Sequence, residues 1–197
     1  MKIILASQSP RRKELLNKIG LTFKVIPSDF NENGIIFDGN PKKYCEELAY
    51  NKAKKVSNNY KDCIVIGADT IVELNGKLFP KPKNLNEANQ FLKVLSGKSH
   101  RVFTGISLIS NQKQSTFNEC TTVTFNNLID SEINFYTKNF NSLDKAGAYG
   151  IQDWSSVFVH KIHGCYFNVM GFPISKFYNE LKKFSPKVVE NLLVTKT

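Results

Sequence analysis

The chain has 197 residues, of which 41% are hydrophobic, and a formal net charge of +10. This length and composition suffice to bury a core as one domain or two joined lobes, which excludes a disordered protein. The sequence has no run of about 18 apolar residues, and its N-terminus becomes polar after a few apolar positions, so it predicts neither a membrane-spanning helix nor a signal peptide. We therefore expect a soluble, cytoplasmic protein without a membrane partner.

The charge and the cysteine content limit which class of binding partner and which cellular compartment we expect. The excess of Lys and Arg over Asp and Glu, 27 against 17, favours a polyanion, either nucleic acid or a phosphate-rich small molecule. Because the basic residues are spread along the chain and form no basic arm, we expect the small molecule and no nucleic acid. The four cysteines form no CxxC pair, which argues against a zinc knuckle or a disulfide framework and favours a reducing cytosol.

The first half of the chain predicts short strands that alternate with helices. In chain order the predicted elements are a strand at 2–6, a helix at 10–19 ended by Gly20, a strand at 22–26, a helix at 41–57 and a strand at 63–74. Asn75-Gly76 follows this last strand and predicts a two-residue hairpin turn.

The second half of the chain is predicted to contain two long strands that follow each other without a helix between them. Its predicted elements are a helix at 86–95, strands at 102–110 and 115–126, a helix at 131–140, strands at 149–151 and 157–162, and a helix at 173–184. A purely parallel sheet would need helices between nearly all strands. We therefore predict an α/β fold with a mixed sheet, a single domain over 1–185 and a C-terminal tail over 186–197.

The segment SQSPRR at residues 7–12 joins the first predicted strand to the first predicted helix. Ser9 suits the N-cap position and Pro10 suits the first helical position. Arg11 and Arg12 then fall in the first turn, where positive charge opposes the helix dipole unless an anion is bound there. Backbone N–H groups, hydroxyls and two guanidinium groups would together cradle a phosphate. A capped helix with two solvated arginines explains the same residues.

Two charged side chains occur where apolar ones are expected. Lys52 lies four residues from both Leu48 and Val56 on the inward stripe of its predicted helix, and either extends to the edge of the core or binds a phosphate in a cleft. Asp69 follows an apolar strand, where an ionised carboxylate must be paired, hydrogen-bonded or bound to a cation. It could hold a divalent ion, orient a water or accept its proton, or form a structural ion pair.

Three other polar features carry less information. Glu32 lies in a polar connector and alone is typical of a solvated side chain. Lys81 lies between two prolines, which suits an aimed ammonium and equally a rigid loop. His160 and His163 would face opposite sides of a strand, so we do not expect them to share a metal.

Six segments, in order over nearly the whole chain, together resemble the Maf family of nucleotide pyrophosphatases. They are LASQSPRRKELL at 5–16, LAYNKAKKV at 48–56, IGADTIVELNGKLFPKP at 66–82, LSGKSHRVFTG at 95–105, DKAGAYGIQ at 144–152 and GCYFNVMGFPISKF at 164–177. The resemblance implies an elongated α/β fold, similar to the inosine triphosphate pyrophosphatases, with a cleft between two lobes, and a homodimer. It also implies hydrolysis of a nucleoside triphosphate between the α- and β-phosphates with a divalent cation, Mg²⁺ or Mn²⁺.

The same resemblance assigns expected roles to residues. Asp69 matches the catalytic proton acceptor of the family, and we expect Glu32 and Asp69 to hold the cation with the substrate phosphates. The positions that match polar residues of the family's cleft are Ser9, Arg12, Glu32, Lys52 and Lys81.

Three further positions bear on base specificity. The subgroup that resembles dTTP/UTP pyrophosphatases has Arg after the Pro, Thr after the catalytic Asp and Gln in the GIQ segment, which correspond to Arg11, Thr70 and Gln152. A glutamine amide can pair with the carbonyl and imide N–H that uracil and thymine share. We therefore expect dTTP, UTP or a modified pyrimidine nucleotide as substrate.

The chain departs from the family pattern after Gln152. The family commonly has Gly, another residue and Gly there, whereas this chain has Asp153, Trp154 and Ser155. Asp153 could repel phosphates or help to bind a cation, and Trp154 could stack on a base or cover the core. Alternative functions are a non-enzymatic regulator of division, a nucleic-acid-binding protein, and a Maf enzyme for 7-methyl-GTP.

Overall fold

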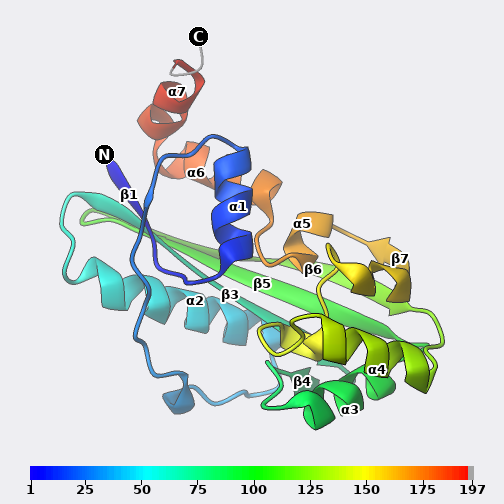
Figure 1. Ribbon diagram of the computed structural model, residues 1–197. Helices are drawn as coiled ribbons and strands as arrows, with labels where there is room; N and C mark the ends of the chain where they lie inside the picture. The colour runs from blue at the N-terminus through cyan, green and yellow to red at the C-terminus, as the bar shows by residue number, and fades with distance from the viewer. Residues whose placement is uncertain (195–197) are drawn as a thin grey trace. The chain divides into compact units, whose positions relative to one another are not determined.

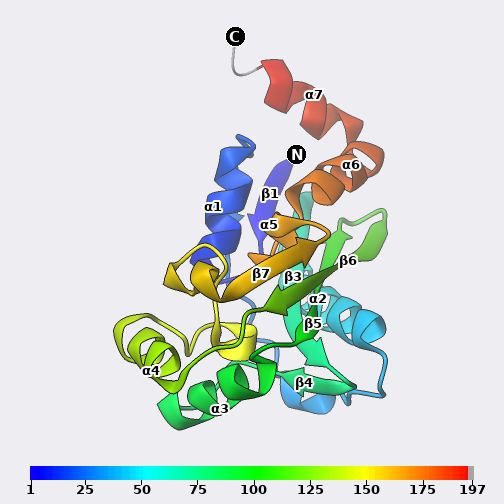
Figure 2. The same cartoon turned by 90° about the vertical axis from the view of Figure 1, so that its right-hand side faces the viewer.

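The computed structural model describes residues 1–194 as helices packed on a seven-stranded sheet (Figures 1 and 2). The strands are β1 (Lys2–Leu5), β2 (Lys24–Val25), β3 (Cys63–Leu74), β4 (Lys77–Phe79), β5 (Ser99–Ile109), β6 (Gln114–Phe125) and β7 (Val159–His163). The α-helices are α1 (Pro10–Lys18), α2 (Pro41–Ser57), α3 (Leu85–Leu95), α4 (Asp130–Asn139), α5 (Tyr166–Val169), α6 (Ile174–Phe184) and α7 (Pro186–Val194). The 3-10 helices are η1 (Glu32–Gly34), η2 (Ala146–Ala148) and η3 (Trp154–Phe158).

The sheet is mixed, as the sequence predicts. Its strand order is β2-β1-β3-β5-β6-β7, with β4 paired to β3 outside this path. β1 is parallel to both β2 and β3, whereas β4 is antiparallel to β3 and β7 is antiparallel to β6. The hairpin turn between β3 and β4 has positive φ at Asn75 and Gly76, 52° and 82°, as a type I′ turn requires. The predicted hairpin is therefore confirmed.

The chain divides into two compact units. Unit 1 comprises Met1–Asp69, Thr104–Glu119 and the chain from Gly171 onward, and unit 2 comprises Thr70–Phe103 and Cys120–Met170. Three of the four boundaries fall inside β3, β5 and β6, so each of these strands contributes residues to both units, and the fourth falls between α5 and α6.

In unit 1, α1 and α2 lie on opposite faces of the sheet (Figures 1 and 2). Helix α2 approaches the strands so closely that a Cβ atom at Gly67 would lie 2.2 Å from Ala49 O, and one at Gly105 would lie 2.3 Å from Cys45 O. The side chains buried on this face are Ile4, Ala6, Ala53, Val56, Cys63, Val65 and Ile109. This close packing fixes the position of α2, and with it Lys52, against β3.

In unit 2, α3 and α4 pack side by side (Figures 1 and 2). Asn89 Nδ2 on α3 donates to Asn134 Oδ1 on α4 at 3.0 Å, and Thr137 Oγ1 donates to Asn89 Oδ1 at 2.7 Å. The largest buried side chains of this core include Phe79, Tyr136 and Phe158. Both helices therefore cover one continuous apolar cluster.

Most predicted elements are present with small shifts of their ends, and one is wrong. The segment 149–151, predicted as a strand, is irregular because Gly147 and Ala148 have positive φ, 70° and 66°, and turn the chain just before it. The strand predicted at 22–26 is reduced to β2. In the expected tail, residues 186–194 form α7, which buries Val188 and Val189, and residues 195–197 lie outside the described residues. Among residues 1–194, no helix combines the length and apolar character needed to cross a membrane.

Candidate active site

Helix α1 begins where the sequence predicts, with two arginines in its first turn. Ser9 is at the N-cap position and Pro10 is the first helical residue. The Ser9 side chain does not cap the helix, and the first turn contains no acidic residue. Because no side chain in this turn neutralises the positive end of the helix, Arg11 and Arg12 lie where a bound anion would be most stabilising.

The Arg12 guanidinium is held by acceptors of the protein itself. Nε donates to Gly171 O at 3.0 Å, and Nη1 donates to Ser7 Oγ at 3.0 Å and to Ala68 O at 2.8 Å. Burial lowers the pKa of Arg12, while the nearby Asp69 raises it, and the group stays protonated. Arg12 is thus a fixed cation that joins α1 to the backbone directly before Asp69.

Lys52 joins the two candidate carboxylates. Its Nζ atom lies 2.5 Å from Asp69 Oδ1 and 2.8 Å from Glu32 Oε1. The side chains of Lys52 and Asp69 are 15% and 14% exposed, whereas that of Glu32 is 50% exposed. The structure therefore brings together three residues that lie far apart in the sequence. It also shows that Asp69 is ion-paired and remains in contact with solvent.

This triad can orient Asp69 for general-base catalysis. The hydrogen bond from the Lys52 ammonium restricts the rotation of the carboxylate. The residual exposure of Asp69 allows a water molecule to reach it. The geometry thus permits proton transfer from water, and the ion pair is also a structural link between α2 and β3.

Tyr44, which was not among the predicted site residues, lies on the same side of α2 as Lys52. Burial raises the pKa of the Tyr44 hydroxyl, and the carboxylates of Asp69 and Glu32 raise it further. Its ring makes an edge contact with Phe37 at a centroid distance of 5.4 Å. The spacing of eight residues between Tyr44 and Lys52 would have identified it.

The remaining predicted site residues belong to unit 2. Thr70 directly follows Asp69 in β3 and is half-buried, whereas Lys81 and Gln152 are exposed. Gly147 N donates to Pro80 O at 3.3 Å, which links the segment of Lys81 to the segment that leads to Gln152. Unit 1 accordingly holds the charged triad with Ser9, Arg11 and Arg12, and unit 2 holds Thr70, Lys81 and Gln152.

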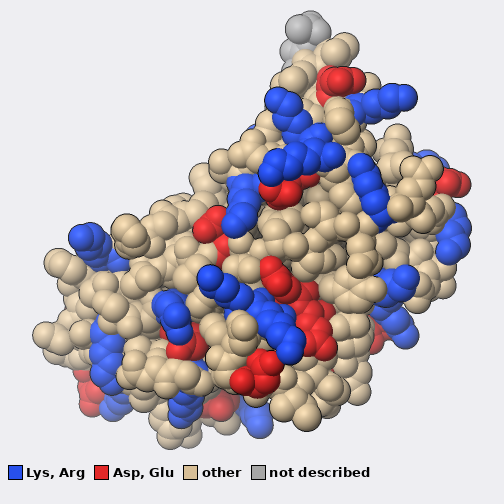
Figure 3. All heavy atoms as spheres, turned by 180° about the vertical axis from the view of Figure 1, so that it is seen from behind, with Lys and Arg blue, Asp and Glu red and all other residues tan. Residues whose placement is uncertain are grey.

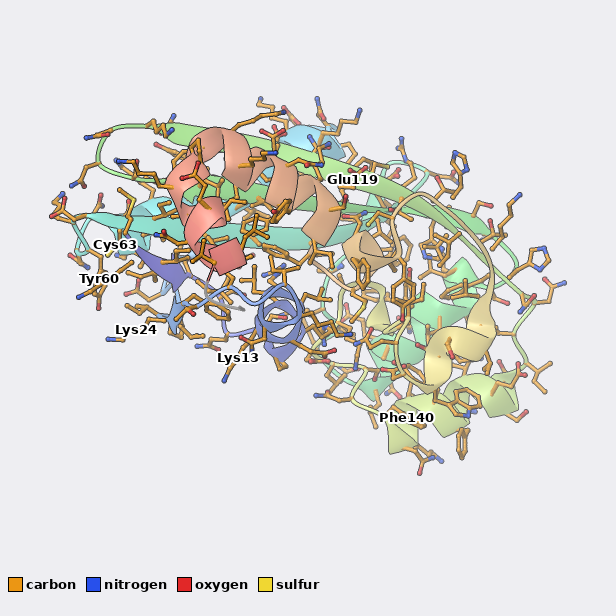
Figure 4. The ribbon with its side chains drawn as sticks, turned by 90° about the horizontal axis from the view of Figure 1, so that it is seen from above. Lys13, Lys24, Tyr60, Cys63, Glu119 and Phe140 are labelled. Atoms are coloured by element: carbon orange, nitrogen blue, oxygen red, sulfur yellow. The ribbon has the colours of Figure 1, made fainter. Side chains whose placement is uncertain are left out.

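The segment after Gln152 makes contacts inside unit 2. The Asp153 carboxylate pairs with Lys145, 3.3 Å from Oδ2 to Nζ. Trp154 is stacked with Tyr136 and with Phe140, which Figure 4 labels, at centroid distances of 6.2 and 6.1 Å. The structure shows an internal ion pair for Asp153, which neither alternative for this residue anticipated, and the core-covering position for Trp154.

The expected cation has a limited set of protein ligands. Within the described residues 1–194, no group of three or more His, Cys, Asp or Glu side chains could hold a metal ion. Lys52 contacts one oxygen of each carboxylate, Asp69 Oδ1 and Glu32 Oε1, which leaves the second oxygens as candidate ligands. Two carboxylates with substrate phosphates and water form a donor set that suits Mg²⁺, so these residues fit the expected cation.

The chain is similar to several known proteins. The dTTP/UTP pyrophosphatase of Clostridium perfringens is 46% identical over 187 residues, which cover 93% of this chain and 97% of that protein. The dTTP/UTP pyrophosphatase of Bacillus anthracis is 47% identical over 184 residues, which cover 93% and 96%. The solved structure of the Staphylococcus aureus Ham1 protein is similar with a TM-score of 0.47 and 18% identity, covering 81% of this chain and 92% of that one. The family model described as Maf-like protein matches residues 2–184, so this chain belongs to the Maf family.

Proposed function

We propose that this chain is a nucleoside triphosphate pyrophosphatase that hydrolyses dTTP and UTP to the monophosphate and pyrophosphate, and so removes unwanted pyrimidine nucleotides from the pool. Its curated relatives at 46–47% identity carry the name dTTP/UTP pyrophosphatase. The observation that carries the mechanism is the Lys52 ammonium, which lies 2.5 Å from Asp69 and 2.8 Å from Glu32.

In the proposed reaction Asp69 acts as the general base. A water molecule loses a proton to the Asp69 carboxylate and attacks the α-phosphorus. The bond from this phosphorus to the bridging oxygen breaks, and pyrophosphate leaves with the bond electrons. Lys52 orients Asp69 before the reaction, and positioning together with charge stabilisation supplies most of the rate gain.

The other charged residues offset the charge of the substrate. Arg12, held by Ser7, Ala68 and Gly171, adds a fixed positive charge, and Lys81 adds a second on a proline-flanked segment. A divalent cation, Mg²⁺ or Mn²⁺, held by Asp69 and Glu32 with the substrate phosphates, would polarise the phosphate.

Base choice is proposed to rest on Arg11, Thr70 and Gln152. Gln152 is exposed, so its amide is available to donate to a carbonyl and accept from an imide N–H. Cytosine presents a different donor and acceptor pattern from uracil and thymine, so CTP should be a poorer substrate.

We place the enzyme in the cytoplasm as a homodimer. The support for a reducing compartment is that Cys45, Cys63, Cys120 and Cys165 are all free thiols. The dimer rests on the family resemblance, and sedimentation of the purified protein tests it.

The test is Asp69→Asn, which removes the base and keeps the size of the side chain. We expect turnover of dTTP, measured as pyrophosphate release, to fall about 1000-fold while nucleotide binding stays measurable. The matched control is Asp62→Asn directly before β3, where turnover should not change. Near-normal turnover in Asp69→Asn would remove Asp69 from the mechanism. A wild-type preference for 7-methyl-GTP over dTTP, UTP and CTP would reject the proposed substrates.

A further inference from the structure

The loop that carries Gln152 is closed by hydrogen bonds between its two ends. Asp153 N donates to Gly150 O at 3.0 Å, and Gly150 N donates to Ser155 Oγ at 3.0 Å. Ser155 N donates to Asp153 Oδ1 at 3.0 Å. The Ser155 hydroxyl lies 2.8 Å from Gly150 O and 2.9 Å from Asp153 Oδ1, and can donate to one of them at a time. Gln152 thus lies inside a closed backbone loop.

The Asp153 carboxylate connects this loop to the core of unit 2. Tyr136 Oη donates to Asp153 Oδ2 at 3.3 Å, and Lys145 Nζ lies 3.3 Å from the same oxygen. Tyr136 is buried and the Lys145 side chain is only 9% exposed. Lys145 Nζ also contacts Asn141 O and Asp144 Oδ1. One carboxylate therefore joins the loop to a buried hydroxyl and a buried ammonium.

The loop also packs against the Lys145 side chain without spare room. A Cβ atom at Gly150 would lie 2.6 Å from Lys145 Cε and 2.8 Å from Asp153 Oδ2. Of these neighbouring residues, Gln152 is exposed, while Gly150, Ile151 and Ser155 are buried. The supporting residues are thus held in the core and the amide of Gln152 faces solvent.

From this geometry we propose that Asp153 is a positioning residue that fixes the Gln152 amide and thereby sets the preference for uracil and thymine over cytosine. The inference rests on the proposed function, in which Gln152 contacts the base. A polar side chain discriminates between bases only where its donor and acceptor have defined positions, because a mobile amide can reorient to accept either pattern. Asp153 restricts the position of Gln152 through its contacts with Ser155 on one side and with Lys145 and Tyr136 on the other.

The experiment compares Asp153→Ala and Asp153→Asn with the wild-type chain on dTTP, UTP and CTP. Asn keeps an acceptor for Ser155 and loses the charge that faces Lys145, so it serves as the milder variant if Ala impairs folding. For Asp153→Ala we expect the ratio of kcat/KM for dTTP to that for CTP to fall about tenfold, chiefly through KM for dTTP, with kcat within about threefold of wild type. The ratio for Asp153→Asn should lie between those of the wild-type chain and Asp153→Ala. The matched control is Ser156→Ala in η3, which should keep the wild-type ratio.

A double-mutant cycle with Gln152→Ala separates positioning from a general structural effect. If Asp153 acts through Gln152, adding Asp153→Ala to Gln152→Ala should leave the base preference of Gln152→Ala unchanged. Additive changes in preference, or wild-type preference in folded Asp153→Ala and Asp153→Asn, would overturn the inference. Wild-type preference in Gln152→Ala would also overturn it and leave the pyrophosphatase activity in place. A wild-type chain that hydrolyses neither dTTP nor UTP would instead reject the proposed function.

Discussion

At the scale of single residues, the ion pair between Lys52 and Asp69 can have both a structural and a catalytic role, and the two roles are compatible. Both side chains are mostly buried, so removal of either leaves the other charge poorly solvated. A general base benefits from the same arrangement, because its orientation is set before substrate binds. Glu32, which is half exposed, can exchange its contact with Lys52 for a cation at low cost.

His100 is a residue whose titration should govern stability rather than catalysis. It is 1% exposed in unit 2, and its Nε2 lies 2.8 Å from the hydroxyl of Tyr149. Its Nδ1 has no hydrogen-bond partner within residues 1–194. The rings of Phe125 and Tyr149 make edge contacts with it at 4.8 and 5.4 Å. Burial in these surroundings lowers the pKa of His100 to about 4.

We predict that the free energy of unfolding falls as the pH falls from about 6.5 towards 4. In this window the unfolded chain binds a proton at His100 and the folded chain does not, so protonation favours unfolding, by about 3 kcal/mol at the acid end. Urea unfolding at a series of pH values measures this slope. His100→Gln keeps a hydrogen-bonding partner for Tyr149 and cannot titrate, so its free energy of unfolding should fall by about 3 kcal/mol less over this pH window. Equal slopes in the two proteins would contradict the assignment.

At the scale of secondary structure, two glycines, Gly67 in β3 and Gly105 in β5, determine how closely α2 packs on the sheet. The backbone atoms that approach Gly67 are Ala49 O and Ala53 N, which flank Lys52 along the helix. Gly67 lies two residues before Asp69 in β3. The close contact between α2 and β3 therefore sets the relative position of the two charged side chains.

We predict that Gly67→Ala destabilises the protein and impairs the triad. The added Cβ would lie 2.2 Å from Ala49 O and 2.7 Å from Ala53 N, so α2 must move away from the strand. We expect a loss of about 3 kcal/mol in urea unfolding and a lower kcat in the protein that stays folded. Gly34→Ala, where the added Cβ meets no atom of residues 1–194 within 4 Å apart from the adjoining residues, should change stability by less than about 1 kcal/mol. Wild-type stability in Gly67→Ala would show that α2 is free to shift.

The spacing of apolar residues and the positions of turn residues predicted most elements. The sequences of α2, β3 and α6, in particular, follow these local patterns. The inward position of Lys52 also followed from helical spacing. Its pairing with Asp69, 17 residues away, depends on how α2 packs, and spacing alone could not reveal it. The segment at 149–151 was mistaken for a strand because hydrogen bonds from backbone N–H groups to the side chains of Asp153 and Ser155 stabilise a loop there instead.

At the scale of the whole molecule, the net charge of +10 does not produce a uniformly basic surface. On the face drawn in Figure 3, Lys and Arg side chains are interspersed with Asp and Glu side chains. Several surface lysines have acidic partners, such as Lys43 with Asp38 and Lys93 with Asp130, both at 2.9 Å. Such mixing favours a small polyanion bound at a defined site over a broad nucleic-acid surface.

Removal of metal should separate catalysis from folding. No group of three or more His, Cys, Asp or Glu side chains within residues 1–194 could hold a metal ion, whereas structural sites are usually closed by protein ligands. We therefore expect EDTA to abolish pyrophosphate release from dTTP while it shifts the thermal midpoint of the nucleotide-free protein by less than about 2 °C. Added Mg²⁺ should restore turnover, and it should raise the midpoint only when a non-hydrolysable dTTP analogue is also present. Full turnover in EDTA would contradict the proposed cation. A fall of about 10 °C in the thermal midpoint of the nucleotide-free protein in EDTA would show that the metal stabilises the folded structure itself. Only a metal that is bound without nucleotide stabilises the free protein.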